Sequence, residues 1–90
     1  QMNGFFTCYP NPSTDGIIFS YSIPENGHVT LEIFSILGKK EVTVIEQVQP
    51  AGNHRINTGH LNLANGIYTA RLTFKAPGHE FLQTLKIIRN

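Results

Sequence analysis

The chain has 90 residues, of which 40% are hydrophobic, and seven basic and six acidic side chains give it a net charge of +1. This length suits one domain, and the apolar fraction is too high for a disordered chain. The basic side chains are scattered, with Lys39-Lys40 as the one adjacent pair of like charge, which argues against nucleic acid as a partner.

The first distinctive segment, residues 8–16, reads CYPNPSTDG. Pro10 and Pro12 lack an N–H group, so neither can donate to a β-ladder. The residue before a proline is pushed toward extended geometry, and Ser, Asp and Gly favour turns. We therefore expect the first strand to end here and the chain to cross to another sheet. Cys8 has no partner for an internal disulfide, and we interpret it as a small apolar side chain in the core.

Apolar and polar residues then alternate, as they do in half-buried β-strands. The first two segments, 17–23 and 29–33, are joined by a tight turn at 24–27, and we expect them to pair in antiparallel fashion. SILGKK reverses the chain again, with Gly38 as the left-handed residue, before a strand that buries Val42 and Val44.

The second half continues the same pattern with a short strand around residues 54–56 and strands at 67–74 and 80–89. Between them, Leu61 and Leu63 are expected to pack beneath the sheets in a single helical turn. About seven short strands without a long helix predict an all-β fold, a single immunoglobulin-like antiparallel β-sandwich. The absence of tryptophan and the single cysteine limit the likeness to architecture.

No arrangement of catalytic or metal-binding residues stands out. None of the histidines pairs with another at a strand spacing of two residues, and none stands in a recognisable ligand pattern; they are His28, His54, His60 and His79. No glycine-rich loop precedes a helix, and a carbohydrate platform of exposed tryptophans is missing. We therefore expect no catalytic residue, no metal site and no cofactor.

Five motifs occur in order along the chain: YPNPSTDGIIFSYSI, VTLEIFSILGKK, AGNHRI, LANGIYTARL and the terminal LKIIRN. This ordered set resembles the C-terminal sorting domain (type A) of cargo proteins of the type IX secretion system of Bacteroidetes. The residues that match the family's motifs are Tyr9, Pro10, Asn11, Pro12, Gly16, Gly38, Lys39, Gly52, Leu63, Gly66, Ile67, Tyr68 and Lys86.

The resemblance implies a non-catalytic signal that directs an N-terminal cargo domain through the outer-membrane translocon and is then removed. Its implied partners are shuttle and translocon proteins of the outer membrane, a sortase-like signal peptidase and the cargo, which can itself be a protease or another hydrolase. The protein would pass through the periplasm to the cell surface or the medium. Residues 1–7 would be a linker or lie near the cut, and residues 8–90 would form the sorting domain.

The last strand is where we expect recognition, since an edge strand and a chain terminus offer unpaired backbone groups to a partner. Leu85 and Ile87 can equally well close the core, whereas Lys86, Ile88 and the terminus favour recognition. A free terminal strand would also allow an edge-to-edge homodimer. The expected recognition residues are Lys86, Ile87, Ile88, Arg89 and Asn90.

Two other functions remain open at this point. One is a structural immunoglobulin-like module, such as that of flagellar hook-capping proteins, which share an asparagine-proline opening and a glycine–aromatic strand start. The other is an accessory domain that binds carbohydrate or peptide for a secreted hydrolase. The first predicts a gene that continues past Asn90, and the second predicts saturable ligand binding by the isolated domain.

Overall fold

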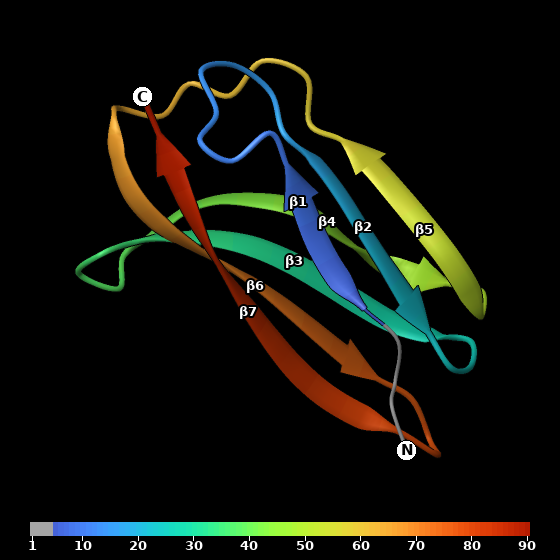
Figure 1. Cartoon of the computed structure of the whole chain (residues 1–90). Coiled ribbons are helices and arrows are strands. Elements are labelled where there is room, and N and C mark those ends of the chain that lie inside the picture. The colour runs from blue at the N-terminus through green and yellow to red at the C-terminus, as the bar shows by residue number, and fades with distance from the viewer. Residues whose placement is uncertain (1–4) are drawn as a thin grey trace.

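The computed structural model describes residues 5–90, which form two antiparallel sheets packed against each other (Figure 1). One sheet has the strand order β1-β2-β5 and the other has the order β4-β3-β6-β7. The predicted seven-stranded all-β sandwich is thus confirmed. The strands are β1 (Phe6–Tyr9), β2 (Ile18–Ile23), β3 (Gly27–Ser35), β4 (Lys40–Gln49), β5 (Gly52–Asn57), β6 (Gly66–Lys75) and β7 (Glu80–Arg89).

The core lies between the two sheets and is built by the alternation that the sequence shows. Every second residue of β2, β3 and β6 is buried, because successive side chains of a strand point to opposite faces. No helix in the described part of the chain is long and apolar enough to cross a bilayer. The buried residues of β2, β3 and β6, together with Ile17 just before β2, are Ile17, Phe19, Tyr21, Ile23, Val29, Leu31, Ile33, Tyr68, Ala70, Leu72 and Phe74.

Two predicted connections are wrong. Strand β2 pairs with β1 and β5 rather than with β3, so residues 24–26 carry the chain from one sheet to the other. The proline-containing segment, in contrast, joins β1 and β2 within one sheet. Alternation identifies which face of a strand is buried, but it contains no information about which strand lies alongside.

The structure also places more of the N-terminal segment in the sandwich than expected. Strand β1 begins at Phe6, which pairs with Tyr21, and the Phe6 ring stacks on Phe19 with centroids 6.0 Å apart. Phe6 and Thr7 therefore belong to the folded unit, whereas residues 1–4 of the expected linker lie outside the described residues.

The segment between β5 and β6 contains no helical turn, contrary to expectation, although Leu61 is buried and Leu63 is half-buried. The Gly59 N–H group donates to Asn57 Oδ1 at 2.9 Å, and Gly59 has a φ of 66°. This local hydrogen bond competes with helical bonding and turns the backbone away from a helix.

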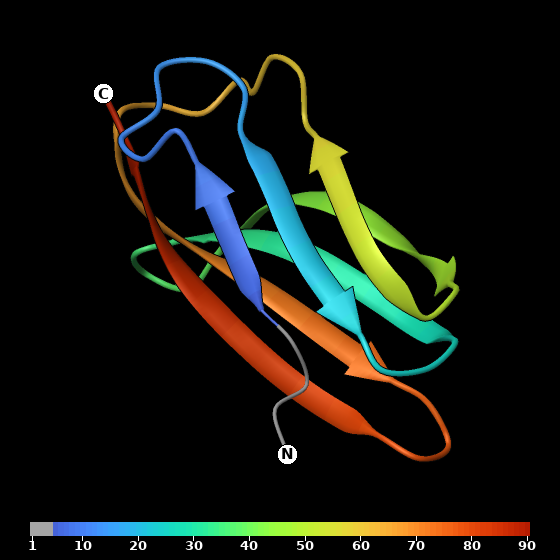
Figure 2. The ribbon, with the colours of Figure 1, turned by 45° about the vertical axis from the view of Figure 1, so that its right-hand side comes forward.

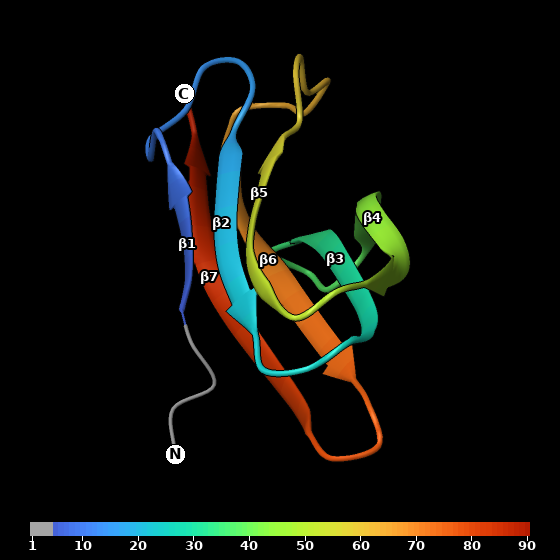
Figure 3. The same cartoon turned by 90° about the vertical axis from the view of Figure 1, so that its right-hand side faces the viewer.

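The beginning of β1 and the end of β7 lie at opposite ends of the sandwich (Figures 2 and 3). The Ser22 N–H group donates to the Phe5 carbonyl where β1 begins and β2 ends. Asn90 is hydrogen-bonded to Ser13 at the other end, beside the β1–β2 and β5–β6 connections.

Candidate functional site

The last residues of β7 are hydrogen-bonded along their outer edge to the opening motif. Asn11 Oδ1 accepts from the Ile88 N–H group at 2.9 Å, and Asn11 Nδ2 donates to the Lys86 carbonyl at 2.9 Å. Ser13 continues the pairing, because its N–H donates to the Ile88 carbonyl at 2.8 Å and its carbonyl accepts from Asn90 N–H at 2.9 Å. We call this arrangement of Asn11 and Ser13 on residues 86–90 the terminal clasp.

The expectation of unpaired backbone groups at the end of the last strand is therefore wrong. Both outward-facing backbone groups of Ile88 are paired, as are the Lys86 carbonyl and the Asn90 N–H group. An asparagine side chain carries an NH2 donor group and a carbonyl acceptor, much like a backbone peptide group, so it can substitute for a neighbouring strand. The contact joins residues 75 and 77 positions apart, and no local pattern reveals such a pairing.

Arg89 is buried at the centre of this end, with 5% of its surface exposed. Its guanidinium donates to Ser13 Oγ at 3.2 Å, to the Leu61 carbonyl at 2.7 Å and to the Asp15 carbonyl. The ion pairs found within residues 5–90 do not include Arg89. The guanidinium therefore holds β7 to the β1–β2 and β5–β6 connections by hydrogen bonds to uncharged oxygen atoms.

The remaining residues of the terminus divide between the core and the surface. Ile87 is fully buried, and Leu85 packs partly buried against the core. The side chain of Ile87 therefore helps to close the core. Lys86 and Asn90 are exposed, and Ile88 is partly exposed.

The accessible side chains of the terminus share the outer face of the larger sheet. Tyr68 and Ile87 are register partners on the buried face, so the adjacent partners Ile67 and Ile88 face outward. Lys86 pairs with Thr69 on the same outer face, and its ammonium has no ion-pair partner among the described residues. The result is a small surface that combines apolar groups with an available positive charge.

The other family motif residues have mainly structural surroundings. The Arg55 guanidinium lies 5.8 Å from the Tyr9 ring centroid and donates to the Tyr9 hydroxyl. The Tyr68 hydroxyl donates to the Ala64 carbonyl at 2.7 Å and so fixes the start of β6. Gly38 has a φ of 90°, which confirms the predicted left-handed turn residue. Most motif residues are exposed, namely Tyr9, Pro10, Asn11, Pro12, Gly38, Lys39, Gly52, Gly66, Ile67 and Lys86.

The folded chain also brings together pairs that the sequence did not indicate. His60 Nδ1 lies 2.7 Å from Asp15 Oδ1, and His79 Nδ1 lies 2.6 Å from Glu25 Oε2. The first pair joins residues 45 positions apart in the sequence, and the second joins residues 54 positions apart, so each links two different connections between strands. Among residues 5–90, no three His, Cys, Asp or Glu side chains form a group that could hold a metal ion.

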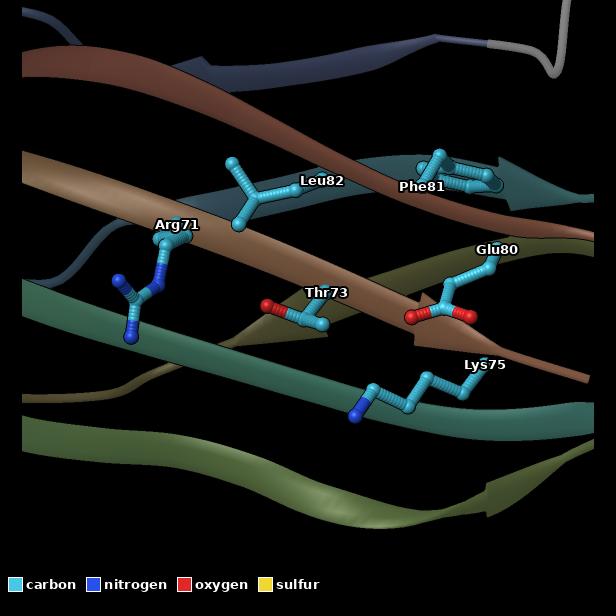
Figure 4. Close-up of a pocket in the computed structure, with 6 residues that line it drawn as sticks. All are labelled: Arg71, Thr73, Lys75, Glu80, Phe81 and Leu82. Carbon is cyan, nitrogen blue, oxygen red and sulfur yellow. The ribbon is translucent and has the colours of Figure 1, made fainter.

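A depression of about 730 Å³ lies on the outer face of β6 and β7 (Figure 4). Its side chains project from two neighbouring strands of one sheet, so it is a surface groove and not an enclosed cavity. Substrate sites normally enclose most of their ligand. The lining residues are Arg71, Thr73, Lys75, Glu80, Phe81 and Leu82.

Cys8 is half-buried in β1, and this burial raises the pKa of its thiol above the usual value of 9.0. Below the pKa of the unfolded thiol, the thiol is neutral in both states and the fold keeps its full stability. This stability is lost as the pH rises through the higher pKa of the folded thiol, because the half-buried group must then ionise. Because the thiolate is the reactive form, we expect iodoacetamide to label the folded chain several-fold more slowly than the urea-unfolded chain at about pH 8. Equal rates, measured by mass spectrometry, would contradict this prediction.

A comparison with protein families completes the description. The family model described as the secretion system C-terminal sorting domain matches residues 7–87. No curated protein and no solved structure matches the chain.

The match includes residues of all seven strands, beginning within β1 and ending within β7. It confirms the resemblance drawn from the ordered motifs, whereas neither the structural module nor the ligand-binding domain gains support. The domain is a sorting signal for type IX secretion, a non-catalytic role, and marks a secreted protein that moves to the cell surface or the extracellular space. The chain belongs to the family of secretion system C-terminal sorting domains.

Proposed function

We propose that outer-membrane components of the type IX system recognise this domain through Lys86, Ile88 and Asn90. The observation that carries the proposal is the exposed side chain of Lys86, which has no ion-pair partner among residues 5–90, beside the outward-facing Ile88. A partner with an apolar surface and a carboxylate would complement both groups. Ile87 and Arg89, which the sequence grouped with them, contribute indirectly by holding the strand in place.

The position of the terminus supports the same proposal. It lies at the end of the sandwich opposite the start of β1 (Figure 3). An N-terminal cargo, which can be a hydrolase, would therefore not cover the recognition residues. We further propose that the sortase-like peptidase cuts ahead of β1, after the shuttle and translocon proteins have carried the cargo from the periplasm to the surface.

The terminal clasp also restricts where a homodimer could form. A second copy that pairs with the edge of β7 would have to use residues 80–85, because the clasp occupies the edge of residues 86–90. Such a dimer would leave Lys86 and Ile88 accessible on the outer face.

An export assay with single substitutions tests the recognition role. The full chain is fused to the C-terminus of a periplasm-directed fluorescent protein in a host with a working type IX system. We expect the fusion to reach the surface or medium, and Lys86→Ala to reduce export about ten-fold or more, as the loss of a contact worth ~1.4 kcal/mol would. Deleting residues 85–90 would be less informative, because it also removes buried Ile87 and Arg89.

The matched control is Lys75→Ala, which removes an exposed lysine from the same β6–β7 strand pair at its far end. Its export should equal that of the unsubstituted fusion. If Lys86→Ala were exported as efficiently as Lys75→Ala, Lys86 would have no part in recognition and the proposal would fail.

A further inference from the structure

We infer that Asn11 is a positioning residue of the sorting signal, and that the export machinery reads the terminal strand from its outer face and not by adding a strand to its edge. The inference rests on the proposed recognition of Lys86 and Ile88. It adds how the partner approaches. It also implies that two segments from opposite ends of the chain form the signal together.

The geometry of Asn11 is specific to this task. Both of its side-chain hydrogen bonds go to β7, one to the Ile88 N–H group and one to the Lys86 carbonyl, each at 2.9 Å. The residue is otherwise exposed, so it contributes little to the core. Pro10 and Pro12 on either side fix φ and carry no N–H group, so neither of them can donate a hydrogen bond to the edge of β7.

The clasp decides which groups of the terminus a partner can reach. Strand addition needs a row of free N–H and C=O groups on an edge. Between the Lys86 carbonyl and the Asn90 N–H group, these outward groups are already bonded to Asn11 and Ser13. The side chains of Lys86 and Ile88 remain available on the outer face, next to Thr69 and Ile67.

Recognition of the strand edge and recognition of the outer face predict opposite effects on export when Asn11 is replaced. If a partner added a strand to the edge, loss of Asn11 would free the edge and leave export unchanged or improved. If a partner reads the outer face, loss of Asn11 would let the strand end fray and misplace Lys86 and Ile88, and export would fall.

The experiment combines export with amide hydrogen exchange on Asn11→Ala and Asn11→Asp in the full chain. Asp retains the acceptor for the Ile88 N–H group but loses the donor to the Lys86 carbonyl. We expect exchange at Ile88 to rise about five-fold or more in Asn11→Ala, the effect of one lost hydrogen bond. Export should fall in both variants, more in Asn11→Ala, at a temperature where each remains folded by circular dichroism.

Asn62→Ala is the matched control, because Asn62 is an exposed asparagine in the neighbouring connection between β5 and β6. It should change neither exchange at Ile88 nor export. If Asn11→Ala does not fold, Asn11→Asp decides the question by export alone, because it retains the acceptor for the Ile88 N–H group and loses only the donor to the Lys86 carbonyl.

If Asn11→Ala exchanges faster at Ile88 but is exported normally, recognition of the outer face is wrong. If its exchange at Ile88 is unchanged, Asn11 does not position the strand. These failures are distinct from a failure of the proposed function. Normal export of Lys86→Ala would remove the recognition role itself, whereas reduced export of Lys86→Ala beside normal export of Asn11→Ala would refute the inference about Asn11 and leave the recognition role of Lys86 standing.

Discussion

The substitution Ile87→Ala is expected to lower the free energy of unfolding by about 2–5 kcal/mol, the range for truncating a buried aliphatic side chain. Ile87 has no exposed surface and pairs with buried Tyr68 across the β6–β7 ladder. Removing its outer carbons would leave a cavity beneath the strand that carries the recognition residues. Urea denaturation of the 90-residue chain, followed by circular dichroism, measures the change.

Its control is Ile88→Ala, one position along the same strand. Ile88 is partly exposed and lies opposite Ile67 on the outer face, so we expect a loss of about 1 kcal/mol or less. Export should nevertheless fall for Ile88→Ala, because the proposed contact with the partner is lost. Equal losses of stability for the two variants would contradict the division of the terminus into a buried and an accessible set.

The second large effect is expected for Gly16→Ala, which should lower the free energy of unfolding by about 2–3 kcal/mol through overpacking. A Cβ atom at Gly16 would lie 2.1 Å from the Gly59 carbonyl oxygen and 2.8 Å from its carbon. Since these are backbone atoms, the two connections would have to move apart. That movement would strain the adjacent hydrogen bonds between Ile17 and Thr58, which measure 2.9 and 3.0 Å.

Gly78→Ala provides a control with a similar contact but a flexible obstacle. A Cβ atom at Gly78 would lie 2.6 Å from Glu25 Oε2, at the end of a side chain that can rotate away. We expect its midpoint of thermal unfolding to stay within a few degrees of that of the unsubstituted chain. If Gly16→Ala were as mild as Gly78→Ala, the close approach of Gly16 and Gly59 would not constrain the fold.

Much of the fold could be predicted because its information is local. The alternation in 17–23, 29–33 and 67–74 correctly identified the buried faces of β2, β3 and β6. Gly38 was correctly placed as a left-handed turn residue. These features depend on side-chain periodicity and on the steric freedom of glycine, which operate over a few residues.

The predictions from the sequence are mostly wrong where the local structure depends on a residue far away in the chain. The turn at 24–27 was expected to join paired strands, but it joins the two sheets. The absence of a helical turn around Leu61 is an exception, because Gly59 and its hydrogen bond to Asn57 act within the connection itself. The start of β1 at Phe6 depends on pairing with Tyr21, which a boundary drawn from the proline motif could not include.

By itself, the sequence determined the fold class, the buried faces of most strands and, through its ordered motifs, membership of the sorting-domain family. These follow from local periodicity, turn chemistry and motif order. Only the tertiary structure decided that Asn11 and Ser13 pair with the end of β7, that Ile87 and Arg89 are buried there, and that Lys86 remains accessible. The reason is that the hydrogen-bonding partners of a strand edge are set by the packing of segments far apart in the chain, and no local pattern encodes them.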